Sequence, residues 1–481
     1  MRSAYKLIFE RSLPGRKGYD LPKLDVPAKA NIVPASYLKT EPVKLPELAE
    51  VDMVRHFIGL SRRNYGVDNG FYPLGSCTMK YNPKINEEVA TLFENLHPYA
   101  DASCTRGAVD VMLKINEALS KITGFPAFTL QPAAGAHGEY TGLTLIKAYH
   151  DNRKDFDRTV IVVPDAAHGT NPASAALAGF KIREIASAPD GGVDLDALRA
   201  AMGPDVAGLM LTNPNTLGIF DHNILEITKI VHDAGGLCYY DGANFNAVMG
   251  VARPGDMGFD ALHLNVHKTF STPHGGGGPG CGAVGCTAEL AQFLPVPVVV
   301  RDGDHGRLEY DRPLSVGKVK AFYGNFAVLV KTLAYIESLG GAGITEGAQN
   351  AVLNANYVMG MLRGVYDIPH DRICMHECVV TPTEAMIEKG VHTSDIAKGL
   401  IDYGVHPPTI YFPLIVHEAM MIEPTETESR ETLDAFVTAM KEIAQTALAD
   451  PEAMHKMPLT TPVGRPDEVA AARNPIVKHQ W

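Results

Sequence analysis

DALHLNVHKTFSTPHGGGGPGCGAVGC, residues 260–286, joins an apolar run, a lysine and a dense series of glycines. Its first part has the composition of a buried strand, which would end just before His267 and Lys268. Its last part contains a GxGxxG match at 280–285. A dinucleotide-binding loop needs a strand directly before this motif and a helix directly after it, whereas STPHGGGGP precedes the match here. We therefore expect the stretch to be organised around its lysine.

Strand-like and helical segments alternate along the neighbouring chain. The apolar runs RTVIVVP (158–164), GLMLTNP (208–214) and GLCYYDGAN (236–244) predict buried strands. Amphipathic segments at 108–124 and 224–236 predict helices that accompany them. This order indicates an α/β fold with a mostly parallel sheet covered by helices. Such a sheet binds its ligands at the C-terminal ends of the strands.

Two further parts flank this α/β region. Residues 1–50 are rich in proline and basic side chains, which predicts an extended arm lying on another surface, with a disordered tail as the alternative. A helix with an apolar face from Leu48 to Ile58 follows. Long helices and the strand-like YFPLIVHEAMMIEP (411–424) come after residue 325. We expect an N-terminal arm with helices at 1–95, a large ligand-binding domain at 96–325 and a smaller C-terminal α+β domain at 326–481.

Composition is typical of a soluble globular protein. Of 481 residues, 46% are apolar and 20% charged, and the net charge of −12 argues against a nucleic-acid-binding surface, which would be basic. We see neither a membrane-spanning apolar run nor the core of a secretory signal. Seven scattered cysteines suit a reducing, cytoplasmic environment. CMHEC (374–378) has the residue types of a metal site but lacks a second matching pair, so we expect no metal.

Polar or small residues follow several predicted strands. They are Gly135 and Ala136 at the start of a helix, His168, Asp241 and Lys268. An aspartate and a lysine at strand ends suit pyridoxal phosphate, because the lysine amine forms a Schiff base with the aldehyde and the aspartate pairs with the ring nitrogen. His168 would stack on the ring, and the helix N-terminus would bind the phosphate.

Six motifs together resemble glycine decarboxylase, the P-protein of the glycine cleavage system. They are GSCTMKYNP (75–83), QPAAGAHGE (131–139), HGTNPASA (168–175), TNPNTLGIF (212–220), YYDGANFNA (239–247) and NVHKTFSTPHGGGGPGCG (265–282). The resemblance covers nearly the whole chain. Because the chain is about half as long as the single-polypeptide form of that enzyme, it is similar to the second subunit of the two-subunit form, which carries the Schiff-base lysine.

This resemblance implies a pyridoxal phosphate enzyme of the aspartate-aminotransferase type. It also implies that the chain decarboxylates glycine and transfers the aminomethyl group to the lipoyl arm of H-protein. The implied partner is a homologous first subunit without the lysine, and the two chains would form an α2β2 tetramer. The N-terminal arm would then help to bind that partner.

The resemblance also implies roles for residues other than Gly135, Ala136, His168, Asp241 and Lys268. Ala243 would lie under the ring, His267 would contact the phosphate or position the lysine, and Ser76, Cys77 and Thr78 would lie on the substrate side. One departure concerns the phosphate loop. Ala134 has no hydroxyl, so the N–H groups of Gly135 and Ala136 must carry more of the phosphate binding, and the role of His137 stays open. The alternatives are another pyridoxal phosphate enzyme, such as an aminotransferase or a desulfurase, a non-catalytic scaffold subunit, and a nicotinamide dehydrogenase.

Overall fold

The computed structural model describes residues 6–29, 32–41, 43–274 and 280–478. The chain forms two compact units, Phe71–His455 and a second made of Met1–Gly70 with Lys456–Trp481. All predicted site residues belong to the first unit. Of the predicted glycine-rich segment, residues 275–279 lie outside the described residues.

A seven-stranded sheet in the order β1-β7-β6-β5-β4-β2-β3 is the centre of the 71–455 unit. The strands are β1 (Ala127–Thr129), β2 (Val160–Pro164), β3 (Lys181–Ile185), β4 (Val206–Thr212), β5 (Leu237–Gly242), β6 (Ala261–Asn265) and β7 (Gly282–Cys286). Strands β3, β2, β4, β5 and β6 pair in parallel, while β7 is antiparallel to both β6 and β1. The predicted mostly parallel sheet is confirmed.

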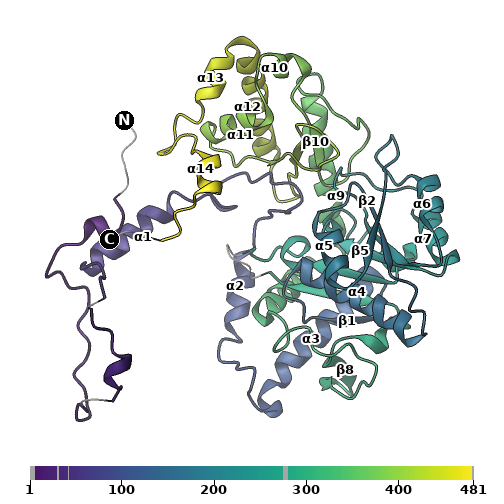
Figure 1. Cartoon of the computed structure of the whole chain (residues 1–481), viewed down its shortest axis with the longest axis horizontal. Helices are drawn as coiled ribbons and strands as arrows, with labels where there is room; N and C mark the ends of the chain where they lie inside the picture. Colours follow the sequence, from purple (N-terminus) through teal and green to yellow (C-terminus); the bar gives the residue numbers. More distant parts are fainter. Residues whose placement is uncertain (1–5, 30–31, 42, 275–279, 479–481) are drawn as a thin grey trace. The chain divides into compact units, whose positions relative to one another are not determined.

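Helices cover both faces of this sheet (Figure 1). They are α3 (Ala102–Thr123), α4 (Gly135–Asn152), α5 (Thr170–Leu177), α6 (Leu195–Ala201), α7 (Ile224–Asp233) and α8 (Val266–Thr269), with short 3-10 turns η3 (Phe245–Ala247), η4 (Pro254–Met257) and η5 (Leu290–Phe293). Successive side chains of β2 point to opposite faces. Ile161 and Val163 pack in the core under α4 and α5, while Val160 and Val162 pack with α3, α6 and α7. The apolar run RTVIVVP is therefore buried on both sides, as a central strand requires.

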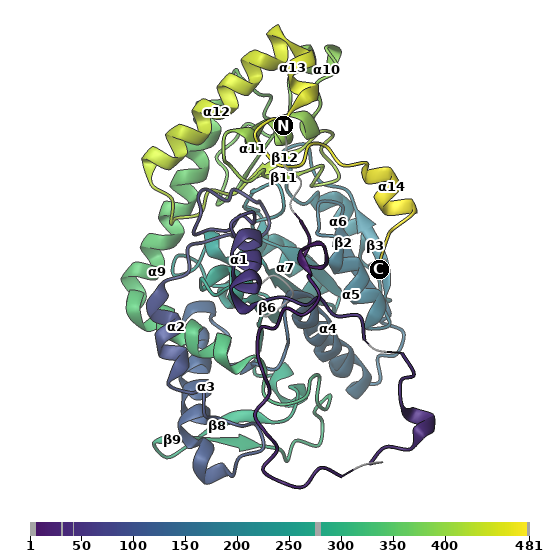
Figure 2. The same cartoon turned by 90° about the vertical axis from the view of Figure 1, so that its left-hand side faces the viewer.

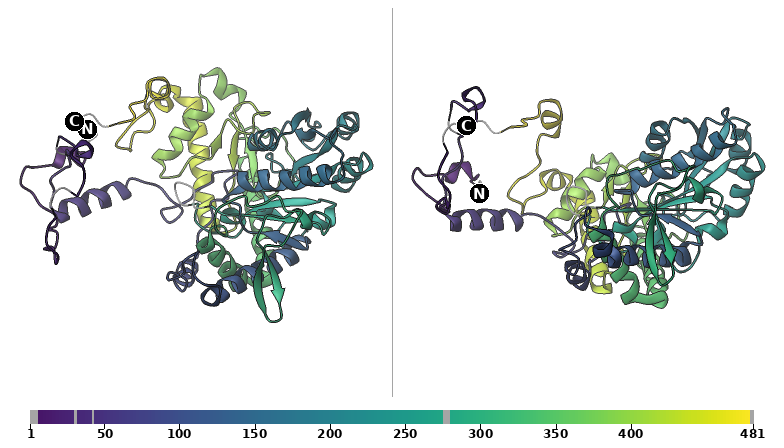
Figure 3. Two further views of the ribbon diagram at one scale, coloured as in Figure 1. Left: turned by 60° about the horizontal axis from the view of Figure 1, so that its bottom comes forward. Right: turned by 90° about the horizontal axis from the view of Figure 1, so that it is seen from below.

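A β-hairpin lies apart from the main sheet (Figure 3). Strands β8 (Val298–Asp302) and β9 (His305–Glu309) pair with each other and pack against α3.

The C-terminal part of the unit has a small sheet with helices around it. Its elements are α9 (Phe326–Leu362), β10 (Cys378–Val380), α10 (Glu384–Glu388), α11 (Thr393–Asp402), β11 (Thr409–Ile410), β12 (Met420–Ile422), α12 (Arg430–Ala449) and α13 (Pro451–Lys456). The strands pair antiparallel in the order β10-β12-β11, and α9 packs along α12 (Figure 2). Of the strand-like stretch 411–424, only Met420–Ile422 is a strand.

Helix α9 is unusually long, with 37 residues. By length and composition alone, α9 could cross a membrane, and it is the one helix among the described residues that meets this test. It bends at Gly340, where φ is 62° and ψ is −177°. Residues on both sides of the bend, including Leu329 and Ala348, are buried in the core. Core helices of soluble proteins share this composition.

The unit that contains the N-terminus has little regular structure. Between residues 6 and 49 it shows two 3-10 turns, η1 (Phe9–Arg11) and η2 (Ala35–Tyr37), within the described ranges. Helix α1 (Glu50–Ser61) follows, and α14 (Glu468–Arg473) belongs to the same unit. Helix α2 (Lys84–Thr91) belongs to the 71–455 unit and packs on α9. The predicted domain boundaries at 95/96 and 325/326 stay predictions.

Candidate active site

A cavity of about 130 Å³ lies at the C-terminal ends of the parallel strands. The predicted residues that border it are Ser76, Gly135, Ala136, His168, Asp241, Ala243 and Lys268. Cys77, Thr78 and His267 are outside its lining. A larger cleft of about 840 Å³ lies beside α3 and β9, but none of the predicted site residues borders it. The smaller cavity is therefore the candidate active site.

Lys268 reaches this cavity from α8, which begins directly after β6. Its Nζ donates a hydrogen bond of 2.8 Å to the carbonyl oxygen of Ser76. The strand thus delivers the lysine to the edge of the sheet, and a distant segment of chain fixes the position of its amine.

Asp241 lies at the end of β5, which pairs with β6, the strand that leads to Lys268. The exposed fraction of Asp241 is 2%. Its Oδ2 accepts a hydrogen bond of 2.7 Å from the Asn171 side chain, and its Oδ1 accepts one of 2.9 Å from the Ala243 N–H. The His263 Nε2 lies 3.4 Å from Oδ1. Burial alone would raise the pKa of Asp241, but His263, these hydrogen bonds and Lys268 outweigh it and hold the pKa below its ordinary value. Asp241 is therefore a buried, ionised carboxylate.

His168 lies in the loop between β2 and α5 and borders the same cavity. Its Nδ1 accepts a hydrogen bond of 3.2 Å from the Thr170 N–H and lies 2.9 Å from the Thr170 hydroxyl. The hydroxyl in turn donates to Glu139, which is buried. The Phe412 ring packs edge-on against His168, with 5.4 Å between centroids. These contacts fix the orientation of the imidazole ring.

The N-terminus of α4 forms another wall of the cavity. The first N–H groups of a helix have no partner inside it, so this end attracts an anion. A Cβ atom on Gly135 would lie 2.5 Å from the Asn265 amide nitrogen, so any larger residue would force the helix end or the Asn265 side chain to shift. His137 accepts a hydrogen bond of 3.1 Å at Nδ1 from the Ala133 N–H. It therefore stabilises the turn that leads into the helix.

Ser76 and Thr78 lie in a turn held by two buried glutamates. The Ser76 N–H donates to Glu377 at 2.8 Å, and the Thr78 N–H donates to Glu423 at 2.9 Å. The φ angles of Ser76 and Thr78 are 65° and 46°, a left-handed conformation that is uncommon outside glycine. Burial raises the pKa of Glu377 well above its ordinary value and that of Glu423 to about 7. The sequence does not predict a role for either glutamate at this site.

Cys77, His267 and His376 are the remaining groups near Lys268. Burial raises the pKa of the Cys77 thiol, although Lys268 opposes this shift. Burial and the neighbouring His274 and Lys268 lower the pKa of His267 to about 3. The Nδ1 of His267 accepts a hydrogen bond of 3.3 Å from the Cys281 N–H. Burial lowers the pKa of His376 to about 3 as well. All three are therefore electrically neutral near pH 7.

The motif CMHEC, for which the sequence predicts no metal, places its residues in two kinds of environment. His376 and Glu377 point to one cluster with Glu423, with the His376 Nε2 3.9 Å from Glu377 and 3.8 Å from Glu423. Cys374 and Cys378 are buried free thiols. The motif thus contributes a histidine and a carboxylate behind the cavity wall.

Known proteins were compared with this chain by sequence and by structure. A family model described as "Glycine dehydrogenase, C-terminal domain" matches residues 347–457. "Probable glycine dehydrogenase (decarboxylating) subunit 2" of Caldanaerobacter subterraneus subsp. tengcongensis is 58% identical over 478 residues, covering 98% of each chain. Its counterpart in Alkaliphilus oremlandii is 57% identical and covers 99% of each.

Among solved structures, the inhibitor-bound glycine decarboxylase (P-protein) of the glycine cleavage system is similar, with a TM-score of 0.71 and 19% identity. The match covers 86% of this chain and 93% of the glycine decarboxylase chain. At this identity the likeness concerns the fold alone. With the observed sheet and the C-terminal α+β part, it confirms the predicted aspartate-aminotransferase type of fold.

Proposed function

The chain belongs to the family of glycine dehydrogenase (decarboxylating) subunit 2, and from this premise we propose that its cavity binds pyridoxal phosphate and decarboxylates glycine. In this proposal the aminomethyl group passes to the lipoyl arm of H-protein, as in the glycine cleavage system. The observation that carries the proposal is the convergence of Lys268 and Asp241 on one cavity with the N-terminus of α4.

The residues of the cavity fit this cofactor. Gly135 lets the start of α4 approach the Asn265 side chain, which also borders the cavity, more closely than a Cβ would allow. The buried Thr212 hydroxyl borders the cavity and has no hydrogen-bond partner among the described residues. Each oxygen of a carboxylate has two lone pairs, so Asp241 can accept a further hydrogen bond from a protonated ring nitrogen. When bound, pyridoxal phosphate supplies an electron sink for the pair released as the bond to the carboxylate carbon breaks.

Each side chain then has a defined task. Lys268 provides the amine that binds the cofactor aldehyde, and the Ser76 carbonyl holds that amine in place. Asp241 keeps a proton on the ring nitrogen, because its own charge is fixed by Asn171 and Ala243. His168 would pack on the face of the ring, and Glu139 and Phe412 restrain its loop. The N–H groups of Gly135 and Ala136 would hold the phosphate, and Ala243 would lie under the ring.

The position of the substrate follows from the other wall. Ser76 borders the cavity, whereas Cys77 and Thr78 lie behind it, so we assign contact with glycine to Ser76 and support of the turn to Thr78. His267 hydrogen-bonds the backbone at Cys281, which supports its alternative role of positioning the lysine. No arginine borders the cavity within the part of the chain that the structure describes.

The partners belong to the same proposal. The family name "subunit 2" supports a homologous first subunit, which we place in an α2β2 tetramer in the cytoplasm. Helix α1 supports such an assembly, because Val51, Val54, Phe57 and Ile58 expose about half of their surface, between 46% and 54%. Exposed apolar faces of this kind mark protein interfaces. The N-terminal arm and α1 would then bind the first subunit.

The test uses the complex of both subunits with pyridoxal phosphate and lipoylated H-protein. We expect Lys268→Ala to abolish glycine-dependent exchange of carbon dioxide, because no other lysine among the described residues borders the cavity. Full exchange in that variant would refute the assignment. An aminotransferase would convert the cofactor with an amino acid alone, whereas we expect turnover to require H-protein.

A further inference from the structure

Alternate residues of the segment 75–80 are bonded to three glutamates of the C-terminal part. Ser76 binds Glu377 and Thr78 binds Glu423 through their N–H groups. Lys80 completes the series, with its Nζ 2.5 Å from the Glu426 Oε1. The segment is thus bonded to the C-terminal part at every second residue.

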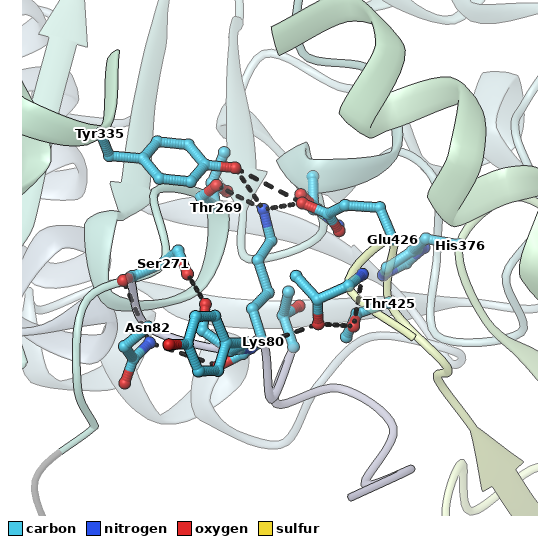
Figure 4. Close-up of polar contacts among 12 residues, drawn as sticks. Lys80, Asn82, Thr269, Ser271, Tyr335, His376, Thr425 and Glu426 are labelled. Carbon is cyan, nitrogen blue, oxygen red and sulfur yellow. Dashed lines mark hydrogen bonds and ion pairs between the residues drawn. The ribbon is translucent and has the colours of Figure 1, made fainter. Parts of the chain in front are cut away.

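Lys80 is a fully buried cation, and hydrogen-bond acceptors and a carboxylate surround its ammonium group (Figure 4). Besides Glu426, its Nζ donates to the carbonyl oxygen of Thr269 at 2.8 Å and to the Tyr335 hydroxyl at 3.2 Å. An ammonium has three protons, and each has an acceptor. Burial lowers the pKa of Lys80, but Glu426 and Tyr335 outweigh it and leave the pKa above its ordinary value. Lys80 therefore stays protonated and does not compete for the cofactor aldehyde.

These bonds enclose the helix that carries Lys268. The Ser76 carbonyl accepts a hydrogen bond from the Lys268 amine, and Lys80 binds the carbonyl of Thr269, the next residue. Helix α8 has four residues, about one turn, and a single turn has little stability of its own. Its position is therefore set by groups outside it, and a cation at the C-terminal carbonyls of a helix is favourable.

We propose that residues 75–80 form a clamp on α8 and that Lys80 is a positioning residue for Lys268. One arm of the clamp is the Ser76 carbonyl, and the other is the Lys80 ammonium. The glutamates anchor the clamp to the C-terminal part of the unit. This inference rests on the proposed function, since it takes Lys268 as the lysine that binds the cofactor.

The test separates positioning from stability. Lys80→Met alone leaves Glu426, whose side chain is only 10% exposed, without its cation. Loss of one partner of such a pair is destabilising, whereas removal of both charges is often nearly neutral. We therefore use the double variant K80M/E426Q. The pair K331M/E87Q serves as the matched control, because Lys331 and Glu87 form an ion pair of 2.6 Å between α9 and α2 that lies outside the clamp.

The primary readout is the rate at which pyridoxal phosphate becomes attached to Lys268 in the apoenzyme of the two-subunit complex. The bond is trapped by borohydride reduction and located by peptide mass. We expect K80M/E426Q to unfold near the wild-type denaturant midpoint but to attach the cofactor about tenfold more slowly or worse, since small displacements of reacting groups carry large rate penalties. We expect kcat for glycine-dependent exchange to fall more than KM changes. The control pair is expected to match the wild type in attachment rate.

A folded K80M/E426Q variant with the wild-type attachment rate and kcat would show that the ion pair is only structural. If the double variant does not fold, Tyr335→Phe takes its place. It keeps both charges and removes one acceptor of Lys80, so slower attachment is expected, and an unchanged rate there refutes the clamp. Trapping at another residue would refute the premise of Lys268. Normal trapping at Lys268 without glycine decarboxylation would refute the proposed function and leave the clamp standing.

Discussion

Asp241 illustrates how the environment, rather than residue type, makes a functional group. A strand-end aspartate is usually a turn residue, but this one is 2% exposed and is held by Asn171, Ala243 and His263. A buried carboxylate that stays ionised can keep a proton on a bound ring nitrogen. Sequence position placed the residue at the strand end, and packing gave it that property.

We predict that Asp241→Asn slows glycine-dependent carbon dioxide exchange by about a hundredfold or more, as loss of a preorganised charge does in other active sites. Asparagine preserves the size of the side chain and can still accept from the Ala243 N–H, but it carries no charge. Exchange is measured at saturating cofactor so that weak binding does not hide the effect. Wild-type rates under those conditions would rule out the pairing with the ring nitrogen.

Glu423 leads to a prediction about pH. Burial raises its pKa from 4.5 to about 7 in the folded protein. Between these two pH values the folded state therefore keeps a proton that the unfolded state has released. The contribution of Glu423 to the free energy of unfolding is fully present below about pH 4.5 and is lost as pH rises through about 7, a change of about 3 kcal/mol at most.

Removing this titration therefore flattens the pH dependence. We expect the free energy of unfolding of the wild type to fall relative to Glu423→Gln between about pH 5 and about pH 8, as measured by denaturant titration at fixed cofactor concentration. The exposed Glu94→Gln variant is the control and is expected to run parallel to the wild type. Parallel curves for wild type and E423Q would contradict a raised pKa.

At the scale of elements, the N-terminus of α4 requires a glycine. A Cβ on residue 135 would lie 2.5 Å from the Asn265 side chain, while a Cβ on the helical Gly107 of α3 meets nothing within 4 Å. We predict that Gly135→Ala weakens pyridoxal phosphate binding about tenfold or more, because the helix end must move away from the phosphate. Gly107→Ala is the matched control and is expected to leave binding unchanged. Cofactor affinity is measured by fluorescence titration of the apoenzyme, and equal affinities for the two variants would exclude a phosphate site at this helix.

Elements also explain what the sequence could and could not predict. Asp241 lies at the end of β5, and Lys268 follows the end of β6, the adjacent parallel strand. The strand pattern alone was therefore enough to bring them together. The bonds from Ser76 to Glu377 and from Thr78 to Glu423 join residues 301 and 345 positions apart. Such pairs depend on how the C-terminal part packs, and local periodicity contains no information about that. The role of Lys80 also depends on this packing. In addition, an isolated lysine in a sequence is usually a solvated charge, so nothing in the sequence distinguishes Lys80.

At the scale of the whole molecule, α1 shows a correct helix prediction with an unexpected environment. Helix α1 begins at Glu50, so the buried Leu48 of the predicted apolar face precedes it, and the face on the helix, Val51, Val54, Phe57 and Ile58, is exposed. The hydrophobic pattern of a helix predicts that its apolar face will be covered. It does not say by which chain.

We predict that the double variant V54E/F57E loses association with the first subunit, because two charges would have to be buried in an apolar interface. The 71–455 unit contains Lys268 and its cavity, so cofactor attachment is expected to persist. Light scattering after size-exclusion chromatography of the co-expressed subunits measures the assembly, and Arg55→Gln, at an exposed polar position of the same helix, is the control. A V54E/F57E variant that still forms the wild-type complex would place the interface elsewhere, and one that also loses cofactor attachment would show that this helix is needed for the fold of the site itself.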